Sequence, residues 1–137
     1  MTFTIENLKE SDVEAVVKLF HIIIDELHEK SLEVERLHFK DMYPAEEVTN
    51  RLSNKDCIYL VARENDNVAG FMFAWVSEGV GNIHWMGIAP EHRKKGYGDK
   101  LIEETIKIFT EKGCYEAKLF TYPSEKAAYH LFQKHGF

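Results

Sequence analysis

The sequence predicts an α+β fold in which one mixed β-sheet carries helices on both faces. The middle of the chain contains three β-rich segments separated by tight turns, which is typical of an antiparallel meander. Apolar residues then repeat at helical spacing and lead into another β-rich segment. This order of strand, helix and strand favours a right-handed crossover between two parallel strands. A length of 137 residues corresponds to a single domain, which would span residues 1–137.

The first third of the chain predicts one strand and two helices. Phe3 and Ile5 alternate with polar residues, as in a short half-buried strand. An amphipathic helix follows, and its apolar stripe consists of Val13, Val16, Val17, Phe20, Ile23, Ile24 and Leu27. Residues 31–43 are polar and acidic with isolated apolar side chains, so their structure is ambiguous. Pro44 then favours the start of a short helix that runs through Leu52.

The rest of the chain completes the predicted sheet. Strands are expected at residues 57–62, 68–76 and 83–88, with tight turns at 65–67 and 79–82. Residues 68–76 are apolar on both faces, so this strand should be covered on both sides. A helix containing Leu101 and Phe109 should stop at Gly113, and residues 115–121 read as the parallel strand. A last helix is expected from residues 123–124 to Gly136.

Composition and charge exclude several classes of protein. A net charge of −6 argues against a nucleic-acid partner, which requires a basic face. The longest apolar run, residues 71–76, is too short to span a membrane, and the N-terminus lacks the pattern of a secretory signal. Cys57 and Cys114 form no CxxC pair and no metal-ligand cluster with histidines, so no metal site is expected. They read as buried thiols in a reducing, cytoplasmic environment.

The segment from Met86 to Leu101 is the most informative part of the chain. A strand ends, a basic loop with two glycines follows, and a helix begins. Backbone N–H groups at a helix N-terminus are unpaired and carry partial positive charge, and glycine lets the backbone approach a ligand closely. This arrangement indicates a phosphate cradle, although a basic turn of this kind is also common as a purely structural feature. The spacing matches neither a P-loop nor a dinucleotide-binding GxGxxG motif.

Two motifs in this order resemble a known family. The run Arg93-Lys94-Lys95-Gly96-Tyr97-Gly98 matches the Arg/Gln-x-x-Gly-x-Gly/Ala motif of the GCN5-related N-acetyltransferases (GNAT). The lead-in Gly87-Ile88-Ala89-Pro90-Glu91 also resembles that family, and residues 126–137 resemble its last helix, which ends in Gly-Phe. The resemblance extends over essentially the whole chain, so it implies a GNAT-like mixed sheet.

The resemblance implies acetyl-CoA as the co-substrate. In the family, the pantetheine arm lies where the strand corresponding to residues 83–88 splays from its parallel neighbour. Here it would bond the backbone of Met86, Gly87 and Ile88. The pyrophosphate would sit on the loop amides of Arg93, Lys94, Lys95, Gly96, Tyr97, Gly98 and Asp99.

The chain also departs from the family pattern. The last helix of the family often carries a tyrosine that protonates the departing thiolate, and Phe132 stands at that position as an apolar wall beside the thioester. A frequent asparagine earlier in that helix corresponds to Glu125. Members usually continue with one or two more strands after Gly-Phe. The alternatives are therefore a sheet completed minimally, a sheet completed by a partner chain as in a homodimer, or a truncated product.

His84 is the candidate proton acceptor, because it is the only titratable side chain within the strand next to the thioester. An amine with a pKa near ~10.4 is almost fully protonated at neutral pH, so a proton must be removed. Some family members place a catalytic histidine at this position. The alternative is a histidine packed on a half-buried strand. Tyr122 and Tyr129 are reserve candidates for protonating the thiolate, and His92 is expected to be solvated.

The acceptor is expected to be a cationic primary amine on a small molecule or a peptide. Residues 25–47 carry eight acidic and three basic side chains, which would attract a cation, although the same pattern fits a solvated acidic surface. We expect direct attack of the amine on acetyl-CoA in a ternary complex, because neither cysteine lies in an activating motif. The alternatives are a transferase that uses a longer acyl-CoA and a non-catalytic acetyl-CoA-binding sensor or partner module.

Overall fold

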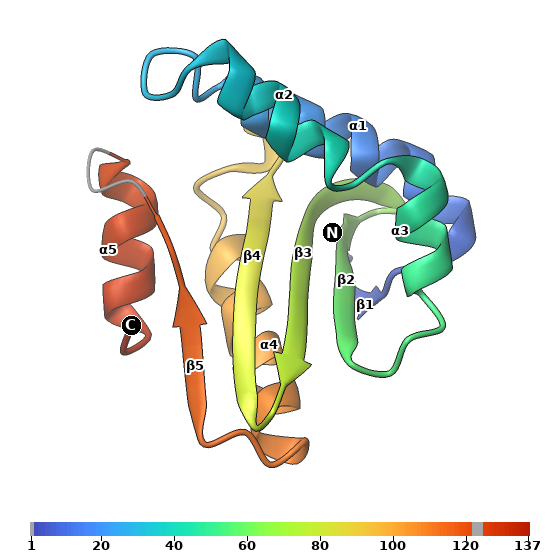
Figure 1. Ribbon diagram of the computed structural model, residues 1–137, viewed down its shortest axis with the longest axis vertical. Helices are drawn as coiled ribbons and strands as arrows, with labels where there is room; N and C mark the ends of the chain where they lie inside the picture. The colour runs from blue at the N-terminus through green and yellow to red at the C-terminus, as the bar shows by residue number, and fades with distance from the viewer. Residues whose placement is uncertain (1, 122–124) are drawn as a thin grey trace.

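The computed structural model describes residues 2–121 and 125–137, and a five-stranded sheet forms the centre of this part of the chain (Figure 1). The strands lie side by side in chain order and are β1 (Phe3–Asn7), β2 (Cys57–Glu64), β3 (Asn67–Ser77), β4 (Val80–Ile88) and β5 (Glu116–Leu119). The first four strands are antiparallel, whereas β5 is parallel to β4. The predicted meander followed by a parallel pair is thereby confirmed.

The two hairpins of the meander use residues in the left-handed backbone region. Asn65 and Asp66 connect β2 to β3 with φ values of 51° and 74°, as their side-chain type favours. The second turn lies one step earlier than predicted, at Glu78 and Gly79, so Gly81 belongs to β4. A Cβ atom at Gly81 would lie 2.4 Å from the Phe109 ring. This glycine therefore permits close packing of a helix on the strand and does not form the turn.

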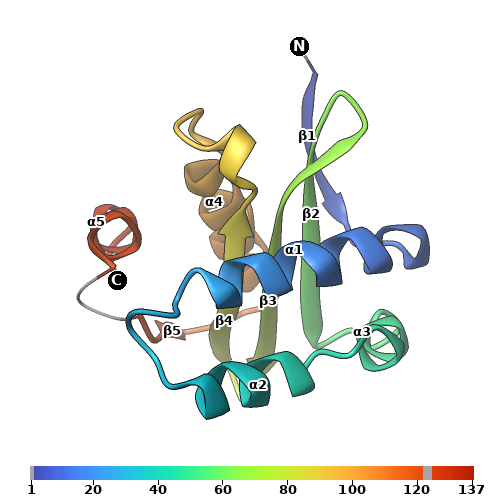
Figure 2. The same ribbon diagram turned by 90° about the horizontal axis from the view of Figure 1, so that it is seen from above.

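Helices cover both faces of the sheet, as Figure 2 shows. One face carries α1 (Val13–Asp25), α2 (Glu33–Asp41) and α3 (Ala45–Arg51). The other face carries α4 (Tyr97–Glu111), while α5 (Lys126–Lys134) flanks it beyond β5. The ambiguous residues 31–43 contain α2, which buries none of its side chains fully, and this explains why its sequence lacks a clear apolar stripe. Short 3₁₀ turns precede α1 (Glu10–Asp12) and follow β4 (Pro90–His92).

The sheet separates two apolar cores. The core under α1 contains Phe20, Phe71 and Phe73, and the core under α4 contains Met72, Leu101 and Ile102. Strand β3 contributes to both, which confirms that residues 68–76 are covered on both faces. Among the residues that the structure describes, no helix combines the length and the apolar character that crossing a bilayer requires.

Candidate functional site

A β-bulge in β4 places His84 and Trp85 on the same face of the sheet. Phe73 pairs with Trp85 and Ala74 pairs with Ile83, so His84 is an extra residue without a partner on β3. In a regular strand the side chains of Ile83 and Trp85 would point to the same face. Here Ile83 packs in the core under α4, whereas Trp85 packs in the core under α1. The bulge thereby directs two successive side chains, His84 and Trp85, to the face covered by α1, α2 and α3.

The parallel pair of strands separates at the same place. Strands β4 and β5 are paired from Val80 with Glu116 to Ile83 with Leu119, and β5 ends there. Strand β4 continues to Ile88, and Figure 1 shows β5 (orange) diverging from β4 (yellow). Within the described residues, the edge of β4 over positions 84–88 has no strand partner. Met86, Gly87 and Ile88 therefore lie on a backbone edge that an extended ligand could hydrogen-bond.

Among residues 2–121 and 125–137, no side chain caps the N-terminus of α4. Gly96 occupies the N-cap position with φ 82° and makes no side-chain cap bond, and a Cβ atom there would meet nothing within 4 Å. A Cβ atom on Gly98 would lie 3.0 Å from Leu131 Cδ2 and 3.9 Å from Met86 Cε, so the first turn of α4 faces β4 and α5. The N–H groups of this turn have no acceptor within the helix. An anion next to the free edge of β4 fits this position.

Most of the charged side chains of the loop are paired with carboxylates of the protein. The guanidinium of Arg93 donates to both oxygens of Glu26 at 2.9 and 2.5 Å, and its Nε donates to the Ile88 carbonyl at 2.9 Å. Lys95 donates to Glu64 at 3.1 Å. Lys94 is exposed. Backbone amides, more than side-chain cations, therefore supply the positive field at this end of α4.

Glu64 at the end of β2 anchors the loop, and sequence reasoning missed it. Its carboxylate accepts a hydrogen bond from the Tyr97 hydroxyl at 2.6 Å and from Lys95, and His92 Nδ1 lies 2.5 Å away. The bond from Tyr97, followed by that from Lys95, lowers the pKa of Glu64 to about 2. The expectation of a solvated His92 is wrong, because its side chain is only 13% exposed. The carboxylate that shelters it lies 28 positions earlier, at the end of a different strand.

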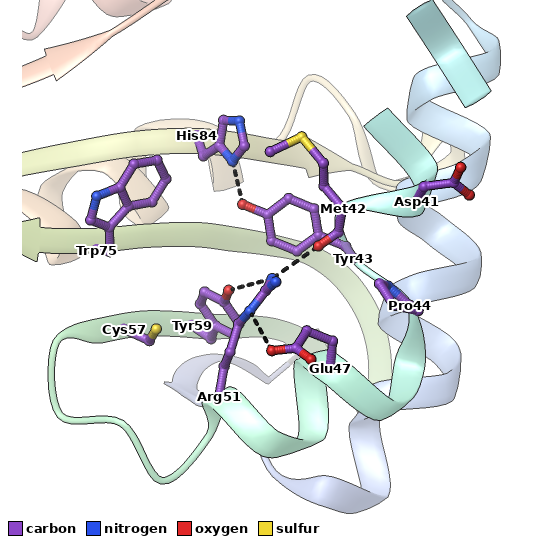
Figure 3. Close-up of a pocket in the computed structure, with 10 residues that line it drawn as sticks. All are labelled: Asp41, Met42, Tyr43, Pro44, Glu47, Arg51, Cys57, Tyr59, Trp75 and His84. Carbon is purple, nitrogen blue, oxygen red and sulfur yellow. Dashed lines mark hydrogen bonds and ion pairs between the residues drawn. The ribbon is translucent and has the colours of Figure 1, made fainter. Parts of the chain in front are cut away.

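A cavity of about 530 Å³ lies on the opposite face, between the α2–α3 connection and strands β3 and β4 (Figure 3). Tyr43, from that connection, is hydrogen-bonded through its hydroxyl to His84 Nδ1. Trp75 packs edge-on against the His84 ring, with the centroids 5.1 Å apart. The walls also include Tyr59 and Cys57. His84 thus belongs to a defined pocket, and within the part of the chain that the structure describes, Tyr43 alone is hydrogen-bonded to its ring.

The charged residues of this pocket are two acids and one arginine. Arg51 Nε lies 3.4 Å from Glu47, its Nη1 donates to the Met42 carbonyl at 3.0 Å, and Asp41 lies at the exposed rim. Burial, followed by the charge of Arg51, lowers the pKa of His84 below 6.5. Burial raises the pKa of Tyr43 above its usual value of 10. His84 is therefore a neutral imidazole at pH 7, and Tyr43 keeps its proton.

Several acids of residues 25–47 are engaged within the protein. Asp25 pairs with Lys40 at 2.7 Å, Glu26 with Arg93, and Glu35 accepts a hydrogen bond from the Leu32 N–H at 2.9 Å. The segment keeps its net charge, but its acids do not converge on one point. Asp41 and Glu47 are the two that line the pocket.

The remaining candidate residues from the sequence lie on helix α5 or next to it. Phe132 is 8% exposed and packs in the core under α4, with its ring 6.2 Å from that of Phe137. Asp99 is bonded to His135 at 2.8 Å and pairs with Lys134 at 3.1 Å, which fastens α5 to the first turn of α4. Tyr129 accepts a hydrogen bond from Gln133 at 3.2 Å. Glu125 pairs with Lys30 at 2.7 Å, and Tyr122 lies outside the described residues.

Comparisons with known proteins agree with this geometry. The model of the acetyltransferase (GNAT) family matches residues 20–137. A curated spermidine N(1)-acetyltransferase of Thermoplasma acidophilum is 24% identical over 102 residues, which are 72% of this chain and 63% of that protein. The chain thus spans less than two thirds of the length of this relative.

Solved structures share the fold. The PaiA N-acetyltransferase of Thermoplasma acidophilum, in complex with coenzyme A, superposes with a TM-score of 0.89 at 22% identity and covers 100% of this chain and 90% of that one. An aminoglycoside acetyltransferase from an uncultured soil metagenomic sample, in complex with sisomicin, has a TM-score of 0.76 at 20% identity and covers 98% and 88%.

Proposed function

We propose that this chain, which belongs to the acetyltransferase (GNAT) family, transfers an acetyl group from acetyl-CoA to a primary amine. The observation that carries the proposal is the free edge of β4 at residues 84–88, which lies between the open N-terminus of α4 and the His84 pocket. A thioester held on this edge would be reachable from the pocket. Cofactor and acceptor would thus meet at the bulge.

The residues around the free edge fit acetyl-CoA. The amides of residues 93–99, with Gly96 and Gly98 leaving the backbone open, suit a diphosphate, because helix N-termini favour anions. The backbone of Met86, Gly87 and Ile88 suits the amide groups of pantetheine. When bound, acetyl-CoA supplies an activated acetyl group. Phe132, which packs in the core under α4, is the proposed apolar wall on the α5 side of this site.

His84 is the proposed proton acceptor. An amine that attacks a thioester acquires positive charge on nitrogen as the N–C bond forms, and it must then lose a proton. A neutral imidazole beside the free edge of β4 can receive that proton at pH 7. The amine would attack the thioester directly, in a ternary complex. The burial of Cys57 supports this route, because it raises the pKa of the thiol and so disfavours the nucleophilic thiolate.

The proposed acceptor is a cationic amine. Asp41 and Glu47 outnumber Arg51 among the charged residues of the pocket, and Tyr43, Tyr59 and Trp75 provide aromatic walls that suit a cation. The relatives support the same class, since one is named as a spermidine acetyltransferase and another is a complex with sisomicin.

Two measurements test the proposal. Acetyl-CoA at about 100 times its Kd should stabilise the protein by roughly 2.7 kcal/mol, seen as a rise in Tm. Release of free CoA should then depend on an amine from a panel of polyamines, aminoglycosides and N-terminal peptides. Stabilisation without turnover would favour the non-catalytic sensor, and faster turnover with longer acyl-CoA would favour the other alternative. An unchanged Tm at millimolar acetyl-CoA would refute the assignment of the co-substrate.

A further inference from the structure

Tyr43 connects the pocket to His84. Its ring stacks on Phe73 at 4.5 Å and 10° and meets Phe20 edge-on at 5.2 Å, so its orientation is fixed by the core under α1. The residue as a whole is 2% exposed, yet it lines the cavity, and its hydroxyl bonds His84 Nδ1 (Figure 3). A hydroxyl on a rigid, cavity-lining ring, bonded to a half-buried imidazole, is suited to pass a proton.

The direction of this hydrogen bond follows from the two groups. Burial raises the pKa of Tyr43, which keeps the phenol protonated, and lowers that of His84, which keeps the imidazole neutral. A phenol O–H is the better donor and an imidazole nitrogen lone pair the better acceptor, so the O–H donates to Nδ1. The hydrogen of neutral His84 is then on Nε2. In this tautomer, Nδ1 is the ring nitrogen that can accept a proton.

We propose that Tyr43 relays the proton of the acceptor amine to His84, so that the hydroxyl receives this proton while it gives its own to Nδ1. The inference rests on the proposed acetyl transfer. The attacking nitrogen is unprotonated, its ammonium proton having already passed to water. As the N–C bond forms, this nitrogen loses a second proton to Tyr43 Oη, and the Tyr43 proton moves to His84. The C–S bond breaks and the sulfur leaves with its electron pair, to be protonated by water. Tyr43 stays neutral, and the resulting imidazolium returns the proton through the hydroxyl to water in the emptied pocket.

The charges around the pair are compatible with this relay. The cation of Arg51 lies 5.2 Å from the centre of the Tyr43 ring, and Glu47 is its ion-pair partner. A phenolate next to Arg51 would be a conceivable alternative, but burial raises the pKa of Tyr43 more strongly than Arg51 lowers it. Transfer that leaves the phenol neutral throughout avoids this cost.

The first test measures the tautomer of His84 without any ligand. Protein labelled with ¹⁵N in its histidine rings should give an NMR spectrum in which the His84 hydrogen is on Nε2 and Nδ1 is a hydrogen-bond acceptor. The His84→Gln variant assigns the signals. Tyr43→Phe should shift the Nδ1 signal, whereas Tyr59→Phe, which removes a hydroxyl bonded to Arg51 from the same pocket, should leave it in place. A hydrogen on Nδ1 in the unaltered protein would overturn the proposal.

The second test is kinetic. Tyr43→Phe should lower kcat about 10²-fold, within the range of general acid–base effects, while the Kd for acetyl-CoA stays the same. The unaltered protein moves two protons in one step, so its solvent deuterium isotope effect on kcat should exceed that of Tyr43→Phe. An unchanged kcat and isotope effect in Tyr43→Phe would overturn the relay alone. A lack of turnover by the unaltered protein with every amine would overturn the proposed function.

Discussion

Gly98 provides a quantitative test of where the diphosphate binds. A Cβ atom at this position would lie 3.0 Å from Leu131 Cδ2, the end of a flexible side chain, so Gly98→Ala requires only a small shift and should weaken CoA binding little. Gly98→Asn and Gly98→Asp add side chains of the same shape, but only aspartate adds a negative charge. The difference between their Kd values for CoA therefore isolates the electrostatic contribution.

The size of this difference follows from Coulomb's law. Two unit charges about 5 Å apart repel by roughly 0.8 kcal/mol in bulk water and by about 3 kcal/mol at an effective dielectric constant of ~20. These energies correspond to Kd values that are between about fourfold and a few hundredfold higher for Gly98→Asp than for Gly98→Asn, at ~1.4 kcal/mol per tenfold change. Added salt should narrow the gap, since it screens exposed charges.

Isothermal titration calorimetry with CoA measures these constants, and the Tm of each variant without ligand controls for folding. Equal Kd values for the asparagine and aspartate variants, both folded, would mean that the diphosphate lies elsewhere. In that case the N-terminus of α4 would not be the diphosphate site.

Three further changes test other parts of the site. His84→Gln should lower kcat/KM by about 10²–10⁴ at nearly constant Kd for acetyl-CoA. It should also remove the acidic limb of the pH–rate profile, whose pKa lies below 6.5, because protonated His84 cannot accept a proton. A loss of kcat/KM under threefold would mean that His84 serves only in packing. Glu64→Gln should weaken CoA binding by releasing the loop. The lowered pKa of Glu64 contributes stability that is present above pH 4.5 and is lost as the pH falls towards about 2. In Glu64→Gln, the fall in stability between these pH values, monitored by circular dichroism, should therefore be shallower. A pH profile of stability identical to that of the unaltered protein would contradict the role of Glu64 as an anchor. Phe132→Tyr should raise kcat several-fold, with an upper bound near 30-fold, because protonating a thiolate of pKa ~8.5 at pH 7 is worth about 2 kcal/mol. An unchanged kcat at unchanged CoA affinity would mean that the side chain at position 132 serves only as an apolar wall.

The sequence predicted the strand, loop and helix of the proposed cofactor side because its signals are local. Strand, glycine-containing loop and helix follow one another within residues 83–112, and helical periodicity and glycine positions report directly on such a segment. The prediction at Gly81 failed for a related reason. A glycine is permissive for turns and for close packing alike, and only the position of Phe109 in the fold distinguishes the two uses.

The acceptor side could not be predicted in the same way. Tyr43 lies 41 positions before His84, in a segment whose helix α2 has too few apolar residues to show its period. The bulge at His84 cannot be recognised in an apolar run, because Ile83 to Ile88 is compatible with a regular strand, in which Trp85 would lie on the same face as Ile83. Glu64 likewise acts on residues 28 to 33 positions later.

The bulge also explains how β4 could serve both ligands in the proposed function, one at its free edge and one in the pocket. Up to Ile83, β4 is paired on both edges and its side chains alternate regularly. After the bulge, one edge is free for an extended ligand, and Trp85 lies with His84 on the face covered by α1, in place of the core under α4. Removing one residue at this point would restore the regular alternation for the rest of the strand. The extra residue thus lies where the proposed proton acceptor, His84, and the free edge of β4 meet.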